Sequence, residues 1–92
     1  MKYYIAGPMS GRPNYNRDKF LKAEMDLLDT GAVVLNPACL PSGLSQPEYM
    51  DICFAMIRAS THIMMLRGWK ESEGATAEYY YAKKLGLTIS FQ

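Results

Sequence analysis

Short apolar segments and longer amphipathic segments alternate along the chain. The short segments are residues 2–6, 32–36, 62–67 and 87–91. They are rich in aromatic and β-branched residues, and glycine or proline bounds several of them, which is typical of buried strands. In residues 62–67 the apolar centre is continuous, as in strands that are covered on both faces. The pattern predicts four strands.

Three helices are expected between these strands. The first begins near Asn14 or Asn16, either of which can cap it, and ends near Thr30, before Gly31. Apolar residues recur in it at helical spacing as two sets. One set is Phe20, Ala23 and Leu27, and the other is Leu21, Met25 and Leu28.

The second and third helices are expected over residues 47–59 and 75–85. A capping box from Ser45 to Glu48 precedes the second helix. Its apolar stripe consists of Met50, Cys53, Phe54 and Ile57. The third helix is expected to end at Gly86, because glycine readily takes the left-handed conformation that closes a helix.

The alternation of strands and helices indicates an α/β domain with a parallel sheet and helices on both faces. Right-handed crossovers favour the strand order 2-1-3-4. Residues 1–92 are expected to form one domain, because a chain of this size supports one core. Ligands bind such sheets beyond the carboxyl ends of the strands, where the winding direction switches. We therefore expect the site between the first and third strands, bordered by residues 7–14, residues 68–74 and the start of the third helix.

Composition narrows the range of partners. Hydrophobic residues make up 49% of the chain, and the net charge is +1. This charge predicts no attraction to nucleic acid or to a membrane surface. No apolar run approaches the roughly 20 residues of a membrane helix. The apolar stretch at the N-terminus is too short for a signal peptide, so a cytoplasmic location is expected.

The cysteines and the histidine do not form a recognisable metal-binding pattern. Cys39 and Cys53 are not a CxxC pair, and His62 is far from both in sequence. We expect two reduced, structural thiols, a histidine that starts a strand, and no bound metal.

The loop after the first strand is a candidate ligand-binding segment. Residues 7–13 match neither the GxGxxG dinucleotide motif nor a Walker A loop. Their backbone N–H groups, together with Ser10 and Arg12, can hold a phosphate or a sugar hydroxyl. An ordinary turn with a solvated arginine is the alternative.

Glu78 is the strongest candidate for chemistry. It shares a helix face with Ala82 and Leu85, which are expected to face the sheet. Burying an unpaired carboxylate costs on the order of several kcal/mol, a cost that a sequence carries more readily when the group has a function. The expected first-turn position favours the ionised form through the helix dipole. Gly74 and Ala75 are small enough to let a ligand approach. The alternative is a glutamate that turns to solvent.

Three further features have two interpretations each. Asp51 follows Met50 in the second helix and either reaches toward the pocket or is a solvated acid. Trp69, the only tryptophan, either stacks on a base or covers the end of the sheet. At least one residue of Tyr79–Tyr81 must leave the core face, which suggests a subunit contact.

Three motifs follow one another with a spacing that spans nearly the whole chain. They are Tyr4-Ile5-Ala6-Gly7-Pro8, then Asp51, and then Gly74-Ala75-Thr76-Ala77-Glu78 with Ala82. Together they resemble the nucleoside 2-deoxyribosyltransferase family, and most of all its short phage- and prophage-type members. The resemblance implies a flavodoxin-like (Rossmann-like) three-layer sandwich. It also implies a retaining reaction without a cofactor, in which Glu78 attacks the anomeric carbon of a 2′-deoxynucleoside and forms a glycosyl ester.

The resemblance also implies roles for other residues. Asp51 would join Glu78 in catalysis by orienting the nucleoside, and Gly7 and its neighbours would line the sugar. A related branch hydrolyses deoxynucleoside monophosphates with a serine and an arginine on the phosphate, and Ser10 and Arg12 are compatible with it. The expected substrate-binding residues are Tyr4, Gly7, Pro8, Met9, Ser10, Gly11, Arg12, Trp69, Gly74 and Ala75.

Two positions depart from the family pattern. The aspartate usually found six residues before the nucleophile is Ser72, which Glu71 or Glu73 could replace, and the glycine two residues after it is Tyr80. Transfer, hydrolysis, and binding without turnover in a nucleotide-binding or interaction module therefore all stay open. The ligand is expected to be a nucleoside or nucleotide. A homodimer or larger homo-oligomer is expected for three reasons. The core of a 92-residue chain is small, the third helix is rich in tyrosine, and the resemblance implies oligomers like those of the family.

Overall fold

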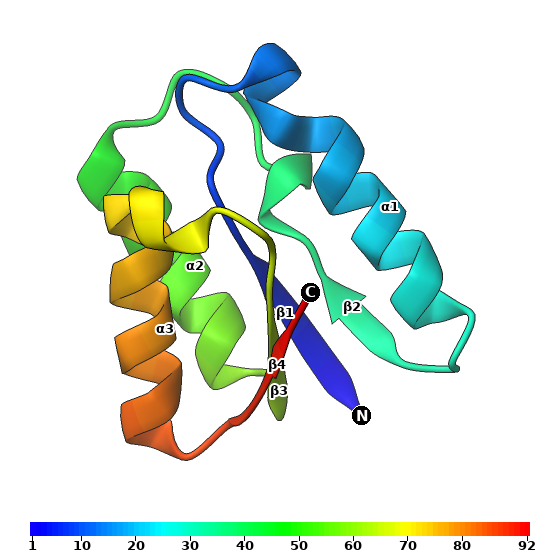
Figure 1. Cartoon of the computed structure of the whole chain (residues 1–92). Coiled ribbons are helices and arrows are strands. Elements are labelled where there is room, and N and C mark those ends of the chain that lie inside the picture. The colour runs from blue at the N-terminus through cyan, green and yellow to red at the C-terminus, as the bar shows by residue number, and fades with distance from the viewer.

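Four parallel strands form the sheet in the computed structural model, which describes residues 1–92. They lie in the order β2-β1-β3-β4, as predicted (Figure 1). The strands are β1 (Lys2–Ala6), β2 (Val33–Leu35), β3 (His62–Met65) and β4 (Thr88–Phe91). In register, Tyr4 lies between Leu35 of β2 and Ile63 of β3.

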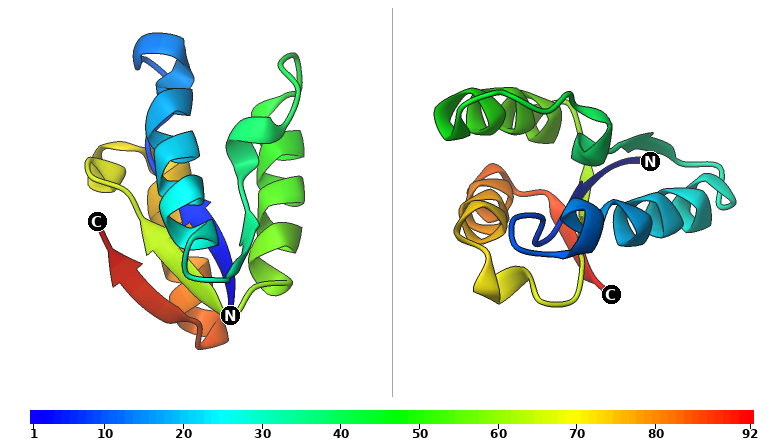
Figure 2. Two further views of the ribbon diagram at one scale, coloured as in Figure 1. Left: turned by 90° about the vertical axis from the view of Figure 1, so that its right-hand side faces the viewer. Right: turned by 90° about the horizontal axis from the view of Figure 1, so that it is seen from above.

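Three α-helices cover the two faces of this sheet, and three short 3-10 helices join the elements. The α-helices are α1 (Arg17–Leu28), α2 (Gln46–Arg58) and α3 (Glu73–Leu85). The 3-10 helices are η1 (Pro13–Asn16), η2 (Pro37–Cys39) and η3 (Trp69–Glu71). α1 lies on one side of the sheet, and α2 and α3 lie on the other (Figures 1 and 2). The predicted three-layer α/β architecture is therefore confirmed. None of the helices is long and apolar enough to span a membrane.

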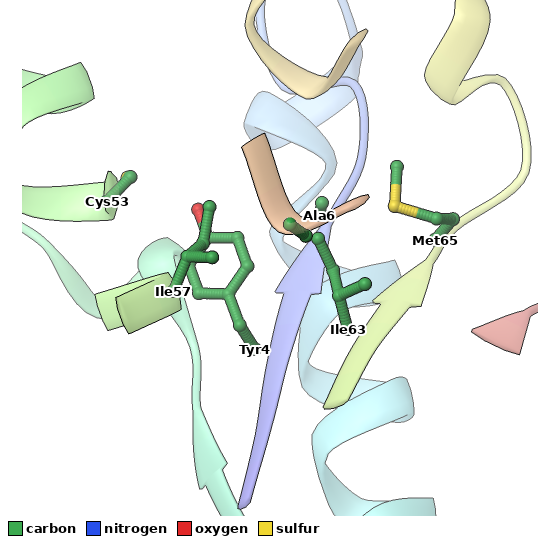
Figure 3. Packing of buried hydrophobic residues seen from close by; sticks show 7 residues of the cluster. Tyr4, Ala6, Cys53, Ile57, Ile63 and Met65 are labelled. Carbon is green, nitrogen blue, oxygen red and sulfur yellow. The ribbon is translucent and has the colours of Figure 1, made fainter. Parts of the chain in front are cut away.

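Alternate side chains of β1 enter two separate cores. Tyr4 and Ala6 pack with residues of α2, α3 and β3 (Figure 3), and Ile5 packs with residues of α1. The first core consists of Tyr4, Ala6, Cys53, Ile57, Ile63, Met65 and Ala82. The second consists of Ile5, Phe20, Ala23, Leu27 and Leu66. A strand with both faces buried explains why residues 2–6 are rich in aromatic and branched side chains.

The ends of the helices follow local capping signals, with one correction. The capping box of α2 is present, and Gly86 ends α3 in the left-handed conformation at φ 84°, as predicted. Asn16 occupies the N-cap position of α1, but its side chain makes no capping bond. Its Nδ2 instead donates to the carbonyl of Pro8 at 2.8 Å, because the backbone of Asn16 is left-handed. The expectation of an asparagine side-chain cap is therefore wrong.

α3 begins at Glu73, two residues before the predicted start. The Oγ of Ser72 accepts a hydrogen bond from the backbone N–H of Ala75 and caps the helix. Glu78 consequently lies in the second turn of the helix. The helix dipole acts less strongly there than in the first turn, where we expected this residue. Leu85 is 46% exposed, so it does not continue the buried face as expected. The buried residues of α3 are Ala75, Glu78 and Ala82.

Some apolar residues of α1 and α3 are exposed, which shows which side of each helix faces the core. The set Phe20, Ala23 and Leu27 is buried, whereas Leu21, Met25 and Leu28 are exposed. Among the three tyrosines of α3, Tyr80 is 61% exposed, which confirms that one of them leaves the core. The subunit contact inferred from it stays a prediction.

Gly7 leaves β1 where no other residue fits. A Cβ added there would lie 2.8 Å from Cβ of Leu66, an atom that cannot move without its backbone. We expect Gly7→Ala to lower the free energy of unfolding by about 1–3 kcal/mol through overpacking. Urea unfolding measures the loss. Gly74→Ala is the matched control, since its nearest neighbour would be Met50 Sδ at 3.8 Å. Equal stability of the two variants would contradict the close approach.

Candidate functional site

A cavity of about 820 Å³ opens at the carboxyl end of β1, where the loops after β1, β2 and β3 meet. Its walls come from the loop after β1 and the start of α1 on one side, and from α2 and α3 on the other. The loop between η2 and α2 crosses above the carboxyl ends of the strands (Figure 1). This is the edge at which ligands bind in open parallel sheets.

Glu78 lies in the wall of this cavity and is held by Tyr4. The side chain is only 7% exposed, and its Oε2 accepts a hydrogen bond from the Tyr4 hydroxyl at 2.8 Å. No hydrogen bond is made to Oε1. Because every fully buried polar side-chain atom in the chain has a hydrogen-bond partner, Oε1 must be partly exposed. Oε1 is therefore the oxygen that a ligand in the cavity can reach.

Burial shifts the acid–base properties of this group. Desolvation raises the pKa of Glu78 to about 7, and the hydrogen bond from Tyr4 and the nearby Cys53 thiol limit the rise. Desolvation, and then the charge of Glu78, raises the pKa of Tyr4 well above its usual value, so Tyr4 remains a donor. Burial also raises the pKa of Cys53 to about 11, which leaves a neutral thiol beside the carboxyl group. The site holds one carboxyl group that changes charge near neutral pH.

Arg12 extends along the rim of the cavity beside Glu71. Its guanidinium lies 3.3 Å from the Glu71 carboxylate. Gly68, with a φ of 85°, makes room for it, because a Cβ there would lie 3.1 Å from Arg12 Nη2. Ser10 also lines the cavity and is exposed. The two predicted phosphate-binding residues thus share the cavity with Glu78.

The structure brings most of the predicted site residues together. Those that line the cavity are Tyr4, Gly7, Pro8, Met9, Ser10, Arg12, Gly74, Ala75 and Glu78. Gly11, Asp51 and Trp69 do not line it. Asp51 is exposed in a shallow depression beside Pro47. Trp69 stacks on Tyr79 at 4.6 Å between ring centroids, which supports the interpretation that it covers the end of the sheet.

Several residues of the cavity wall escaped the sequence analysis. Tyr15, Arg17 and Ser42 come from η1, α1 and the loop after η2. Arg17 lies over the ring of Tyr15, with Cζ 5.3 Å from the centroid, and its Nη2 donates to Ser42 Oγ at 3.4 Å. Topology could have pointed to Ser42, because the loop after the second strand begins at the same sheet edge as the loops after the first and third strands.

The cavity suits an organic ligand better than a metal. No group of three or more His, Cys, Asp or Glu side chains is placed to hold a metal ion. Its volume falls within the roughly 300–1,000 Å³ of small-molecule sites. Its lining combines apolar side chains with hydroxyl, carboxyl and guanidinium groups, as such sites do.

Comparisons with known proteins agree with this fold. A family model described as "Domain of unknown function (DUF4406)" matches residues 1–91. The structure of a 2-deoxyribosyltransferase from Leishmania mexicana aligns with a TM-score of 0.78 and 22% sequence identity. The alignment covers 98% of this chain and 62% of that chain, so this chain spans less than two thirds of the transferase's length. No curated protein sequence matches the chain. The deoxyribosyltransferase-like fold expected from the motifs is confirmed.

Proposed function

Because the chain belongs to a family described only as a domain of unknown function (DUF4406), we propose its activity from the cavity and the shared fold. It cleaves the N-glycosidic bond of a 2′-deoxynucleoside or its 5′-monophosphate. Glu78 is the nucleophile, and the reaction passes through a covalent glycosyl ester.

One observation carries the proposal. Glu78 is a nearly buried carboxyl group with one oxygen fixed by Tyr4 and the other facing the cavity. Burying a carboxyl group lowers the stability of a chain of 92 residues, a cost that a sequence carries more readily when the group has a function. The fold shared with the Leishmania 2-deoxyribosyltransferase supports a nucleoside ligand.

The proposed reaction has two steps. In the first, Oε1 of Glu78 attacks C1′, the bond from C1′ to the base nitrogen breaks, and the base leaves with the electron pair and takes up a proton. In the second, a water or a second base attacks C1′ and the carboxylate of Glu78 leaves. A water that attacks gives up a proton and yields the free sugar. Tyr4 keeps Oε2 in place through both steps.

Glu73 is the carboxyl group best suited to supply the proton to the leaving base. It lines the cavity on α3, and no basic side chain pairs with it. Glu71 also lines the cavity but is held by Arg12. Ser72, at the position of the family's aspartate, caps α3 through its Oγ. Asp51, which faces away from the cavity, receives no role within a single chain.

Binding without turnover is a second candidate, and the capping role of Ser72 favours it, because a serine cannot supply the proton that an aspartate would. It predicts that nucleotides raise the midpoint of thermal unfolding without releasing base. The first candidate predicts free base. Incubation with each deoxynucleoside and each monophosphate, followed by chromatography of the bases, separates them. If no base appears with any substrate, the proposed reaction is wrong.

The rate of base release should rise with pH. Only ionised Glu78 can attack, and its pKa is about 7 in the folded protein, so kcat/KM should increase through pH 7 and then level off. Tyr4→Phe removes a hydrogen bond that lowers this pKa, which should move the midpoint upward by roughly one pH unit. Initial rates at a series of pH values test both statements. A midpoint that Tyr4→Phe leaves unchanged would show that another group limits the rate.

A further inference from the structure

The two arginines of the cavity differ in their partners. Arg12 lies 3.3 Å from the carboxylate of Glu71. Arg17 has no acidic group within ion-pair distance, and its guanidinium contacts the Ser42 hydroxyl at 3.4 Å and the ring of Tyr15. Arg17 is therefore the cation of the cavity whose charge is not already matched.

This difference affects where an anion can bind. An anionic group at Arg12 would lie next to the Glu71 carboxylate, which would repel the anion. Otherwise the anion would have to displace Glu71 from Arg12. An anion at Arg17 meets no such charge and gains the Ser42 hydroxyl as a second donor. Charge-assisted bonds of this kind are stronger than bonds between neutral groups.

The remaining charges are arranged across the cavity. Glu73 and Glu78 both belong to α3, on one face of the sheet, whereas Arg17 belongs to α1, on the other face. A ligand with an anionic end is therefore repelled by the wall of α3 and attracted to the wall of α1. Such a ligand enters with its anion toward Arg17 and its neutral part toward Glu78.

Local structure holds Arg17 in position. The three residues before it, Asn14 to Asn16, have left-handed φ values of 51°, 54° and 60°. Asn16 ties this turn to the carbonyl of Pro8 at 2.8 Å. The turn carries the ring of Tyr15 to the guanidinium, with 5.3 Å between Cζ and the ring centroid. Non-glycine residues rarely adopt this conformation, and such strain is found more often at functional sites.

We infer that Arg17 and Ser42 hold the phosphate of a nucleoside 5′-monophosphate while Glu78 faces its glycosidic carbon. The inference rests on the proposed function and deepens it by naming the residues that select a monophosphate over the free deoxynucleoside. It differs from the expectation drawn from the sequence, which gave the phosphate to Ser10 and Arg12.

The test compares two kinds of measurement on the full chain. The first is the ratio of kcat/KM for a deoxynucleoside monophosphate to that for the matching deoxynucleoside. The second is calorimetric binding of 2-deoxyribose 5-phosphate, with inorganic phosphate as a second probe, neither of which requires turnover. The variants are Arg17→Gln, Ser42→Ala and, as the matched control, Arg58→Gln, which removes the same charge from an arginine outside the cavity. Thermal unfolding of each variant shows that it is folded.

Arg17→Gln should lower both the kcat/KM ratio and the affinity for 2-deoxyribose 5-phosphate by about 10- to 100-fold, and Ser42→Ala by a smaller factor. Arg58→Gln should change either by less than about threefold, since Arg58 lies outside the cavity and its guanidinium donates to the Tyr81 hydroxyl. Inorganic phosphate should bind more weakly than the sugar phosphate and lose affinity in the same variant.

The outcomes separate the two proposals. If base is released but Arg17→Gln leaves both quantities unchanged, or Arg58→Gln lowers them equally, the inference is wrong and the proposed function stands. If no base is released but sugar phosphate binding depends on Arg17, the anion site stands and the proposed reaction is wrong. If neither base release nor sugar phosphate binding occurs, both are overturned.

Discussion

Replacing Glu78 with glutamine is expected to slow the release of free base by about 10³-fold or more, the scale on which loss of a nucleophile acts. Glutamine has nearly the same shape, and its carbonyl oxygen can still accept the hydrogen bond that Tyr4 donates to Oε2. The amide cannot form the glycosyl ester. The loss should appear in kcat for every substrate, because the missing group acts after binding.

Two controls accompany this measurement. Glu71→Gln removes a carboxylate that also lines the cavity but is bound to Arg12, and it should retain most of the activity. Binding of 2-deoxyribose 5-phosphate should survive in Glu78→Gln, which shows that the cavity is intact. A Glu78→Gln protein with more than a tenth of the original activity would exclude Glu78 as the nucleophile.

The free energy of unfolding is expected to fall by roughly 3 kcal/mol as the pH rises from 4.5 to 7, because one pKa unit corresponds to about 1.4 kcal/mol. Desolvation raises the pKa of Glu78 from 4.5 to about 7 in the folded protein. Between these values the unfolded chain releases the proton and the folded chain keeps it. The stabilisation is therefore complete below pH 4.5, declines as the pH rises, and is lost above about pH 7.

Urea unfolding at pH 4.5 and at pH 8 measures this difference. The glutamine of Glu78→Gln cannot ionise. The change in the free energy of unfolding between the two pH values should therefore be smaller in this variant than in the original protein, by the contribution of Glu78. Above pH 7 the variant should be more stable than the original protein, and near pH 4.5 the two should be similar. If both proteins show the same pH dependence, Glu78 is not a buried carboxyl group with a raised pKa.

The arrangement of helices and strands could be predicted because local signals and topology rules agree. The apolar segments and the glycine and proline residues that bound them located all four strands. The preference for right-handed crossovers predicted the strand order. The position of Glu78 on the inner face of α3 followed from the same periodicity. Its distance from the helix start did not, because the Ser72 side chain caps α3 through the backbone N–H of Ala75 and the helix begins two residues before the predicted start.

Other parts of the site depend on geometry that periodicity does not encode. Asp51 is one residue beyond Met50, which lines the cavity, but one residue is about 100° of helix, enough to turn Asp51 outward. Trp69 follows the left-handed Gly68 and packs on Tyr79, outside the cavity lining. Arg17 reaches the cavity after three consecutive left-handed residues, a conformation that no local sequence rule predicts.

The most direct test of the account is to trap the glycosyl ester. The protein is mixed with substrate in excess, quenched in acid within one turnover, digested and analysed by mass spectrometry. The account predicts that the peptide containing Glu78 gains the mass of a deoxyribosyl or deoxyribosyl phosphate group, and that Glu78→Gln shows no such gain. Base release by a protein that never carries the sugar, or that carries it on another residue, would contradict it.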